Sequence, residues 1–304
     1  MTDRTYDAYG LTIRVPFACP ALPAADARST AGVPDVVVRA GSVPRRLRAP
    51  QAGEGAWEAA PGAFLLRGGS RAGRFLVESG TVTFERNPGC DDAVLARCFT
   101  QYVLAALLRQ RGLLVLHANA VMTPGGVIVI SGESGTGKST TTAALLNAGC
   151  RMVSDDLTAL RRGGAPGSVD VVPGAAEIHL TGNAAAALGY RVSQAQLQPW
   201  RRMKAAISTG DDMARRPGRL QALYVLRRSA GDDVTATAVG GGDKFRALQE
   251  CMYGPLFAED HPALFPLMIT VTTVPFLFLD RPTGRWSVSE VTREILGQAA
   301  EPVR

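Results

Sequence analysis

The stretch Gly132-Glu133-Ser134-Gly135-Thr136-Gly137-Lys138-Ser139 decides the fold expected of this chain, because it follows the pattern GxxxxGK[ST]. Glycines let successive backbone N–H groups turn inward without Cβ clashes, which suits a ligand with concentrated negative charge such as a triphosphate. The pattern predicts that Lys138 reaches the β- and γ-phosphates of ATP and that the Ser139 hydroxyl binds Mg²⁺. The predicted ATP-binding residues are Gly132, Glu133, Ser134, Gly135, Thr136, Gly137, Lys138, Ser139 and Thr140.

The residues on both sides of this loop have the expected character. Residues 127–130 form a short apolar, β-branched run typical of a buried strand. Residues 139–148 are compatible with a helix that ends at Gly149. Strand, loop and helix therefore follow one another in the order that a phosphate-binding loop requires.

Composition sets the class of protein and its partners. With 304 residues the chain is long enough for two domains. A net charge of +6 favours anionic partners, which a nucleotide already satisfies, and no motif indicates a nucleic acid. Five scattered cysteines without a CxxC pair indicate neither disulfides nor zinc. We expect a soluble, cytoplasmic protein with no membrane partner, because no signal peptide or membrane-spanning stretch is evident.

The chain divides near residue 112. Alternating apolar runs separated by turn formers predict a β-rich domain over residues 1–112, with a connecting helix from about residue 91 and a peptide-recognition role. Residues 113–304 are predicted to form the catalytic domain. Within it we expect strands at 152–160, 169–172 and 220–226 and two more within 265–279, and helices at 184–188, 195–203 and 244–252. A capping box at 287–290 predicts a C-terminal helix.

Two adjacent carboxylates, Asp155 and Asp156, follow the strand expected after the loop helix. Beside a magnesium triphosphate, two such groups can divide the work. One orients the metal while the other accepts a proton from an incoming hydroxyl. A solvated turn at the end of a strand is the alternative interpretation of the same pair.

The run from His117 to Asp156 resembles the catalytic core of the bacterial HPr serine kinase/phosphorylases, in which a histidine precedes the loop by the same interval and a G-x-R-[LM]-V-x-D-D segment follows it. The resemblance implies an α/β fold, with an HPr-kinase-like P-loop catalytic domain and a smaller β-rich N-terminal domain. It implies that Lys138 and Ser139 hold the phosphates and Mg²⁺, that Asp155 is the general base toward a seryl hydroxyl with His117 near it, and that Asp156 assists at the metal. It also suggests a homo-oligomer, commonly a hexamer.

Two departures from that family narrow what the resemblance implies. Thr140 stands where an acidic residue is usual, and the signature at the second metal contact is only partly present as Glu177-Ile178-His179. Glu177 is a candidate metal ligand or a surface residue. The reverse, phosphate-removing reaction is therefore not implied. The opening residues 6–13 and the segment after Glu177 look more like the branch that phosphorylates serine in precursor peptides, notably those of lasso peptides.

Other functions stay open at this point. They are a kinase of an HPr-type carrier protein, a small-molecule or carboxykinase-like P-loop enzyme, and a non-catalytic module that binds peptide under nucleotide control. The sequence also does not decide which cationic side chains stabilise the transferred phosphoryl group. The candidates are Arg201, Arg202, Lys204, Arg215 and Arg216.

Overall fold

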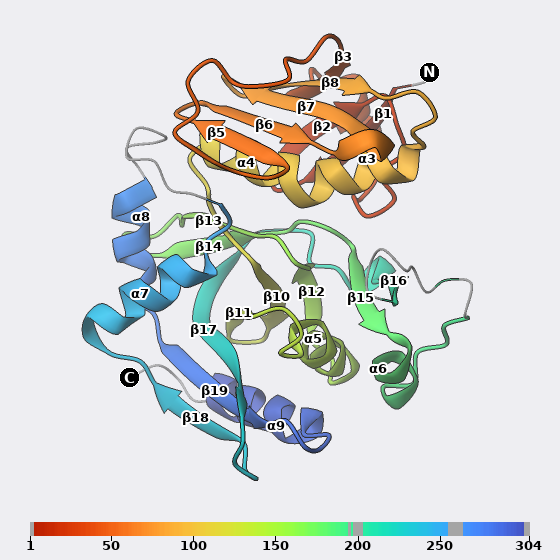
Figure 1. Ribbon diagram of the computed structural model, residues 1–304. Helices are drawn as coiled ribbons and strands as arrows, with labels where there is room; N and C mark the ends of the chain where they lie inside the picture. Colours follow the sequence, from red (N-terminus) through yellow and green to blue (C-terminus); the bar gives the residue numbers. More distant parts are fainter. Residues whose placement is uncertain (1–2, 194–195, 197–202, 255–263, 301–304) are drawn as a thin grey trace. The chain divides into compact units, whose positions relative to one another are not determined.

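The computed structural model describes residues 3–193, 196, 203–254 and 264–300 (Figure 1). The chain forms two compact units. The first contains Met1–Val115 and Met252–Pro266, and the second contains Leu116–Cys251 and Leu267–Arg304. The mixed α/β character with several sheets agrees with the predicted class. The assignment of separate roles to residues 1–112 and 113–304 remains a prediction.

The first unit is built on one eight-stranded sheet in the order β1-β2-β3-β8-β7-β6-β5-β4. Most neighbours are antiparallel, but β3 runs parallel to both β2 and β8. Its strands are β1 (Arg4–Ala8), β2 (Leu11–Val15), β3 (Val36–Ala40), β4 (Ala52–Glu54), β5 (Trp57–Ala60), β6 (Ala63–Arg67), β7 (Gly73–Glu78) and β8 (Thr81–Arg86), with short helices α1 (Ala27–Ala31) and α2 (Gly69–Ala72) between them.

A long helical segment covers this sheet, as the sequence predicts from residue 91 onward. It starts at α3 (Asp92–Cys98), where the Asp91 carboxylate accepts the Val94 N–H at 2.9 Å, and it ends with α4 (Leu104–Gln110). A π-helical turn, η1 (Phe99–Val103), interrupts it and packs on β6 and β7. Phe99 lies edge-on to Phe17 with ring centroids 6.0 Å apart, so aromatic packing fixes the segment on the sheet.

Strand β9 (Leu114–Leu116) leads into the second unit, whose main sheet runs in the order β12-β10-β11-β17-β14-β13. Strand β19 pairs with β17 and with β18 at one side. The strands are β10 (Ala118–Thr123), β11 (Gly126–Gly132), β12 (Arg151–Ser154), β13 (Thr158–Arg162), β14 (Val169–Val172), β17 (Gly218–Ser229), β18 (Thr235–Ala238) and β19 (Phe276–Pro282). A separate two-stranded antiparallel sheet pairs β15 (Glu177–Thr181) with β16 (Lys204–Ser208), and α6 (Gly182–Ala187) directly follows β15.

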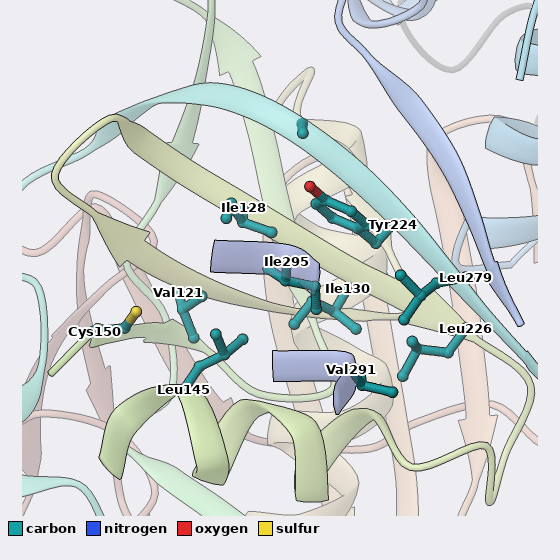
Figure 2. Packing of buried hydrophobic residues seen from close by; sticks show 11 residues of the cluster. Val121, Ile128, Ile130, Leu145, Cys150, Tyr224, Leu226, Leu279, Val291 and Ile295 are labelled. Atoms are coloured by element: carbon teal, nitrogen blue, oxygen red, sulfur yellow. The ribbon is translucent and has the colours of Figure 1, made fainter. Parts of the chain in front are cut away.

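Helices complete the second unit. Helix α5 (Lys138–Asn147) packs beside α9 (Val288–Ala300), and both cover the sheet through an apolar cluster that includes Ile130, Leu145 and Ile295 (Figure 2). The other helical segments among the described residues are η4 (Gly210–Asp212), α7 (Gly241–Cys251) and α8 (Leu264–Val271). Helix α8 begins in the first unit and continues in the second from Leu267. None of the described helices is long and apolar enough to cross a bilayer.

The structure corrects three sequence predictions in this unit. Residues 152–160 are two strands, β12 and β13, because the chain turns sharply at Asp156. The segment 265–279, predicted as two strands, is helix α8 followed by strand β19. Helix α9 starts where the capping box predicts, but Glu290 pairs with Arg285 instead of bonding back to the cap. The helix expected at 195–203 lies almost wholly outside the described residues.

Candidate functional site

The glycine-rich loop joins β11 to α5, and its backbone conformation requires glycine. Gly132 has a φ of 136° and Gly137 a φ of 106°, both in the left-handed region that L side chains rarely adopt. A Cβ atom on Gly132 would also clash with the Leu226 carbonyl oxygen on β17. The loop is therefore held close to a neighbouring strand, with the N-terminus of the ten-residue helix α5 directly after it.

Lys138 occupies the first position of α5, and its side chain is buried against the loop. Its ammonium donates to the carbonyl oxygens of Gly132 at 2.7 Å and Glu133 at 3.3 Å, and it lies 3.3 Å from Nε2 of His117. Burial lowers the pKa of Lys138. A cation in this position is stabilised by the loop's own carbonyl groups and is aimed at the place where the phosphates are expected.

His117 precedes β10 and lies between Lys138 and Asp156. Its backbone is fixed at both ends, because its N–H donates to the Cys251 carbonyl at 2.7 Å and its carbonyl accepts the Ser131 hydroxyl at 3.0 Å. Nδ1 of His117 is 3.7 Å from Oδ1 of Asp156. Burial and then the Lys138 charge lower the pKa of His117, so the neutral imidazole is favoured beside the lysine.

Asp155 and Asp156 lie in a tight turn between β12 and β13. The Leu157 N–H donates to the Asp155 carbonyl at 2.7 Å across Asp156, whose φ is 65°. Such a positive φ in a non-glycine residue is strained and persists only where the surroundings enforce it. Asn119 does so, because its buried side-chain oxygen accepts the Asp156 N–H at 3.1 Å while its amide nitrogen lies 3.1 Å from the Thr142 hydroxyl on α5.

The turn separates the environments of the two carboxylates. The side chain of Asp156 is 50% exposed, while that of Asp155 is only 2% exposed. His179 on β15 donates from Nδ1 to Oδ2 of Asp155 at 2.9 Å, which leaves Oδ1 buried without a partner among the described residues. Glu177 lies near the other ring nitrogen of His179, with its Oε2 3.9 Å from Nε2. Asp155 is thus a buried acceptor with one free oxygen.

A cavity of about 580 Å³ lies at this site, and its lining includes many of the predicted residues. These are His117, Ser134, Gly135, Gly137, Lys138, Ser139, Thr140, Asp156 and Lys204. The predicted residues that do not line it are Gly132, Glu133, Thr136, Asp155, Glu177, Arg215 and Arg216. Arg201 and Arg202 lie outside the described residues. The ligand-binding roles of all these residues remain predictions.

Several lining residues were not predicted from the sequence, including Arg281, Arg285 and Trp286. Strands β11, β17 and β19 run parallel, so their carboxyl ends meet at one edge of the sheet. The loop follows β11, and Arg281 lies near the end of β19. Polar residues after the apolar run 276–279 were the available signal, but placing two strands in 265–279 obscured it.

The lining fits a magnesium ion only as a partner of bound phosphates. Mg²⁺ is usually held by one or two protein oxygens together with phosphates and water. Ser139 and Asp156 both line the cavity and offer such oxygens. Over the described ranges, no cluster of three or more His, Cys, Asp or Glu side chains is arranged to hold a metal alone. Glu177 stays a predicted ligand.

Known proteins resemble this chain in structure but not in sequence. No family model matches the sequence, and no curated protein matches it significantly. The solved structure of the Hpr(Ser) kinase/phosphatase from Coxiella burnetii aligns with a TM-score of 0.35 and 15% identity, over 60% of this chain and 89% of that chain.

Proposed function

We propose that this protein is an ATP-dependent kinase that transfers the γ-phosphoryl group to a serine hydroxyl of a peptide. The observation that carries the proposal is a chain of contacts from the loop to Asp156, the neighbour of Asp155. Lys138 lies 3.3 Å from His117, and His117 lies 3.7 Å from Asp156, within one cavity lined by the glycine-rich loop. A solvated surface turn does not require such an arrangement.

The residues supply what phosphoryl transfer needs, namely positioning and charge stabilisation. On this proposal the loop N–H groups and Lys138 bind the phosphates, and Ser139 and Asp156 hold Mg²⁺, which neutralises developing charge. Asp155 accepts the serine proton on Oδ1, since Oδ2 is bonded to His179. Because Asp155 is buried, the acceptor hydroxyl has to enter the cavity and pass the exposed Asp156 to reach the Asp155 carboxylate.

The proposed acceptor is a ribosomally made precursor peptide, of the kind that matures into a lasso peptide. The resemblance of residues 6–13 and the diverged segment after Glu177 support this choice. The β-rich first unit is the proposed peptide-recognition part. At one end of its sheet, residues 23–25 already bond the outer edge of β1 through Asp7 N–H to the Pro23 carbonyl and Ala25 N–H to the Thr5 carbonyl. The other end is β4, and the edge of a sheet is a common place for an extended peptide to bind.

The test is intact-mass measurement of acceptors after incubation with the protein, ATP and Mg²⁺. A precursor peptide encoded beside this gene, its Ser→Ala version and an HPr protein are run in parallel. We expect a phosphate-sized gain on the peptide, lost when the serine is replaced. Gain on HPr alone would move the proposal to a carrier-protein kinase, and no gain on either would contradict peptide kinase activity.

Asparagine variants test the division of work between the carboxylates. Asp155→Asn is expected to lower the rate of phosphoryl transfer by about 10²-fold or more. The affinity for ATP should stay nearly unchanged, because only proton acceptance is lost. Asp156→Asn is expected to weaken the apparent affinity for Mg²⁺ as well. If Asp155→Asn transfers like the wild type while Asp156→Asn is inactive but binds Mg²⁺ normally, Asp156 is the base.

A further inference from the structure

Two arginines stand side by side at the edge of the sheet where the glycine-rich loop lies. Arg228 on β17 and Arg281 on β19 are register partners in the parallel pair. Other arginines near them have carboxylate partners: Arg227 bonds Asp280 at 2.6 Å and Arg285 bonds Glu290 at 2.7 Å. Neither Arg228 nor Arg281 has a carboxylate partner among the described residues.

Both side chains face the loop but in different ways. Arg228 donates to the Gly135 carbonyl at 2.9 Å, so it anchors the loop. The Arg281 guanidinium lines the cavity and lies only 3.6 Å from where a Cβ atom on Gly137 would be. Its Nε is buried and has no hydrogen-bond partner among the described residues.

This arrangement is electrostatically unfavourable without an anion. Burial and then the neighbouring Arg228 charge lower the pKa of Arg281. A buried guanidinium donor without a partner is costly, and a phosphate oxygen is an acceptor that its planar fork matches well. A phosphate group in the cavity would give Arg281 the acceptor that it lacks among the described residues.

We propose that Arg281 contacts the terminal phosphate of the bound nucleotide, with Arg228 as the positioning residue, so that the site selects triphosphate over diphosphate. This inference rests on the proposed nucleotide-binding function. In a glycine-rich loop the backbone N–H groups hold mainly the α- and β-phosphates. The γ-phosphate is left to side chains, and Arg281 comes from a different strand from the one that leads into the loop.

The test measures binding, so that it does not depend on phosphoryl transfer. Titration calorimetry gives the dissociation constants of ADP and of the β,γ-imido analogue of ATP, each with Mg²⁺, for the wild type and Arg281→Gln. We expect Arg281→Gln to weaken the triphosphate analogue about tenfold or more and ADP less than about twofold, as for one lost charge-assisted contact. Arg281→Lys is expected to fall between, because it keeps the charge but loses the fork.

Arg227→Gln is the matched control, since Arg227 lies next to Arg228 on β17 and on the strand beside Arg281 but pairs with Asp280. It is expected to bind both nucleotides like the wild type, and thermal unfolding checks that every variant is folded. Equal weakening of the analogue and ADP by Arg281→Gln, or no weakening, would overturn the inference. If the wild type still binds nucleotide through Lys138, the proposed function survives that result. A wild type that binds neither nucleotide would overturn both.

Discussion

At the scale of single residues, the site combines local and long-range features. The sequence predicts the loop, Lys138 and the Asp155-Asp156 pair because their chemistry lies in consecutive positions. It does not predict that His179 bonds Asp155 or that Asn119 holds the Asp156 N–H, since those contacts join β15 and β10 to the turn. The local sequence around a buried polar residue does not indicate which distant residue will be its hydrogen-bond partner.

His179 provides a prediction for a positioning residue. Replacing it by alanine removes the hydrogen bond to the buried Asp155 carboxylate, so kcat should fall about tenfold to a hundredfold while KM for ATP changes little. His179→Asn should restore part of the rate, because an amide nitrogen can donate from a similar position. The measurement is steady-state transfer to the peptide acceptor. A wild-type kcat in the alanine variant would show that the bond does not matter to the reaction.

At the scale of elements, the predictions succeeded where periodicity and end signals agree. Strand β11 and helix α5 are confirmed, because a β-branched run and a glycine after the helix mark their limits. The segment 265–279 failed because its apolar residues are nearly continuous, and such a run does not distinguish a buried helix from a strand. In the structure Leu264–Val271 is helix α8.

Helix α9 provides a prediction for an element. Ile295 is fully buried in the cluster that joins α9 to α5 and the sheet (Figure 2). Ile295→Ala should lower the free energy of unfolding by about 2–5 kcal/mol through lost burial and the cavity left behind. Arg293→Ala, on the exposed side of the same helix, is the control and should change it by less than about 0.5 kcal/mol. Equal effects in denaturant unfolding would contradict the packing described for α9.

At the scale of the whole molecule, the chain is two compact units whose cores hold all five cysteines. Cys19, Cys90 and Cys98 belong to the first unit, and Cys150 and Cys251 to the second. Burial raises the pKa of each thiol, that of Cys19 to about 12, so little thiolate is present at pH 8. The composition predicts free thiols, but it does not show that they are buried.

Thiol reactivity therefore reports on the opening of each unit. At pH 8 an aromatic disulfide reagent should react slowly with the thiols of the native protein. In denaturant it should react with all five thiols. Since the raised pKa values suppress the thiolate, the native rates should rise with pH above 8. Single Cys→Ser variants assign each rate to a unit. Rapid reaction of several thiols in the native protein would contradict the burial described here.

Binding of a nucleoside triphosphate by the loop Gly132–Ser139 underlies every step proposed for this protein. Calorimetric titration with the β,γ-imido analogue of ATP and Mg²⁺ measures that binding, and saturable one-site binding to the wild type is expected. Lys138→Ala should weaken it by about tenfold or more, because a buried charge-assisted contact to the phosphates is lost. No binding to the wild type, or equally tight binding to Lys138→Ala, would contradict nucleotide binding by this loop.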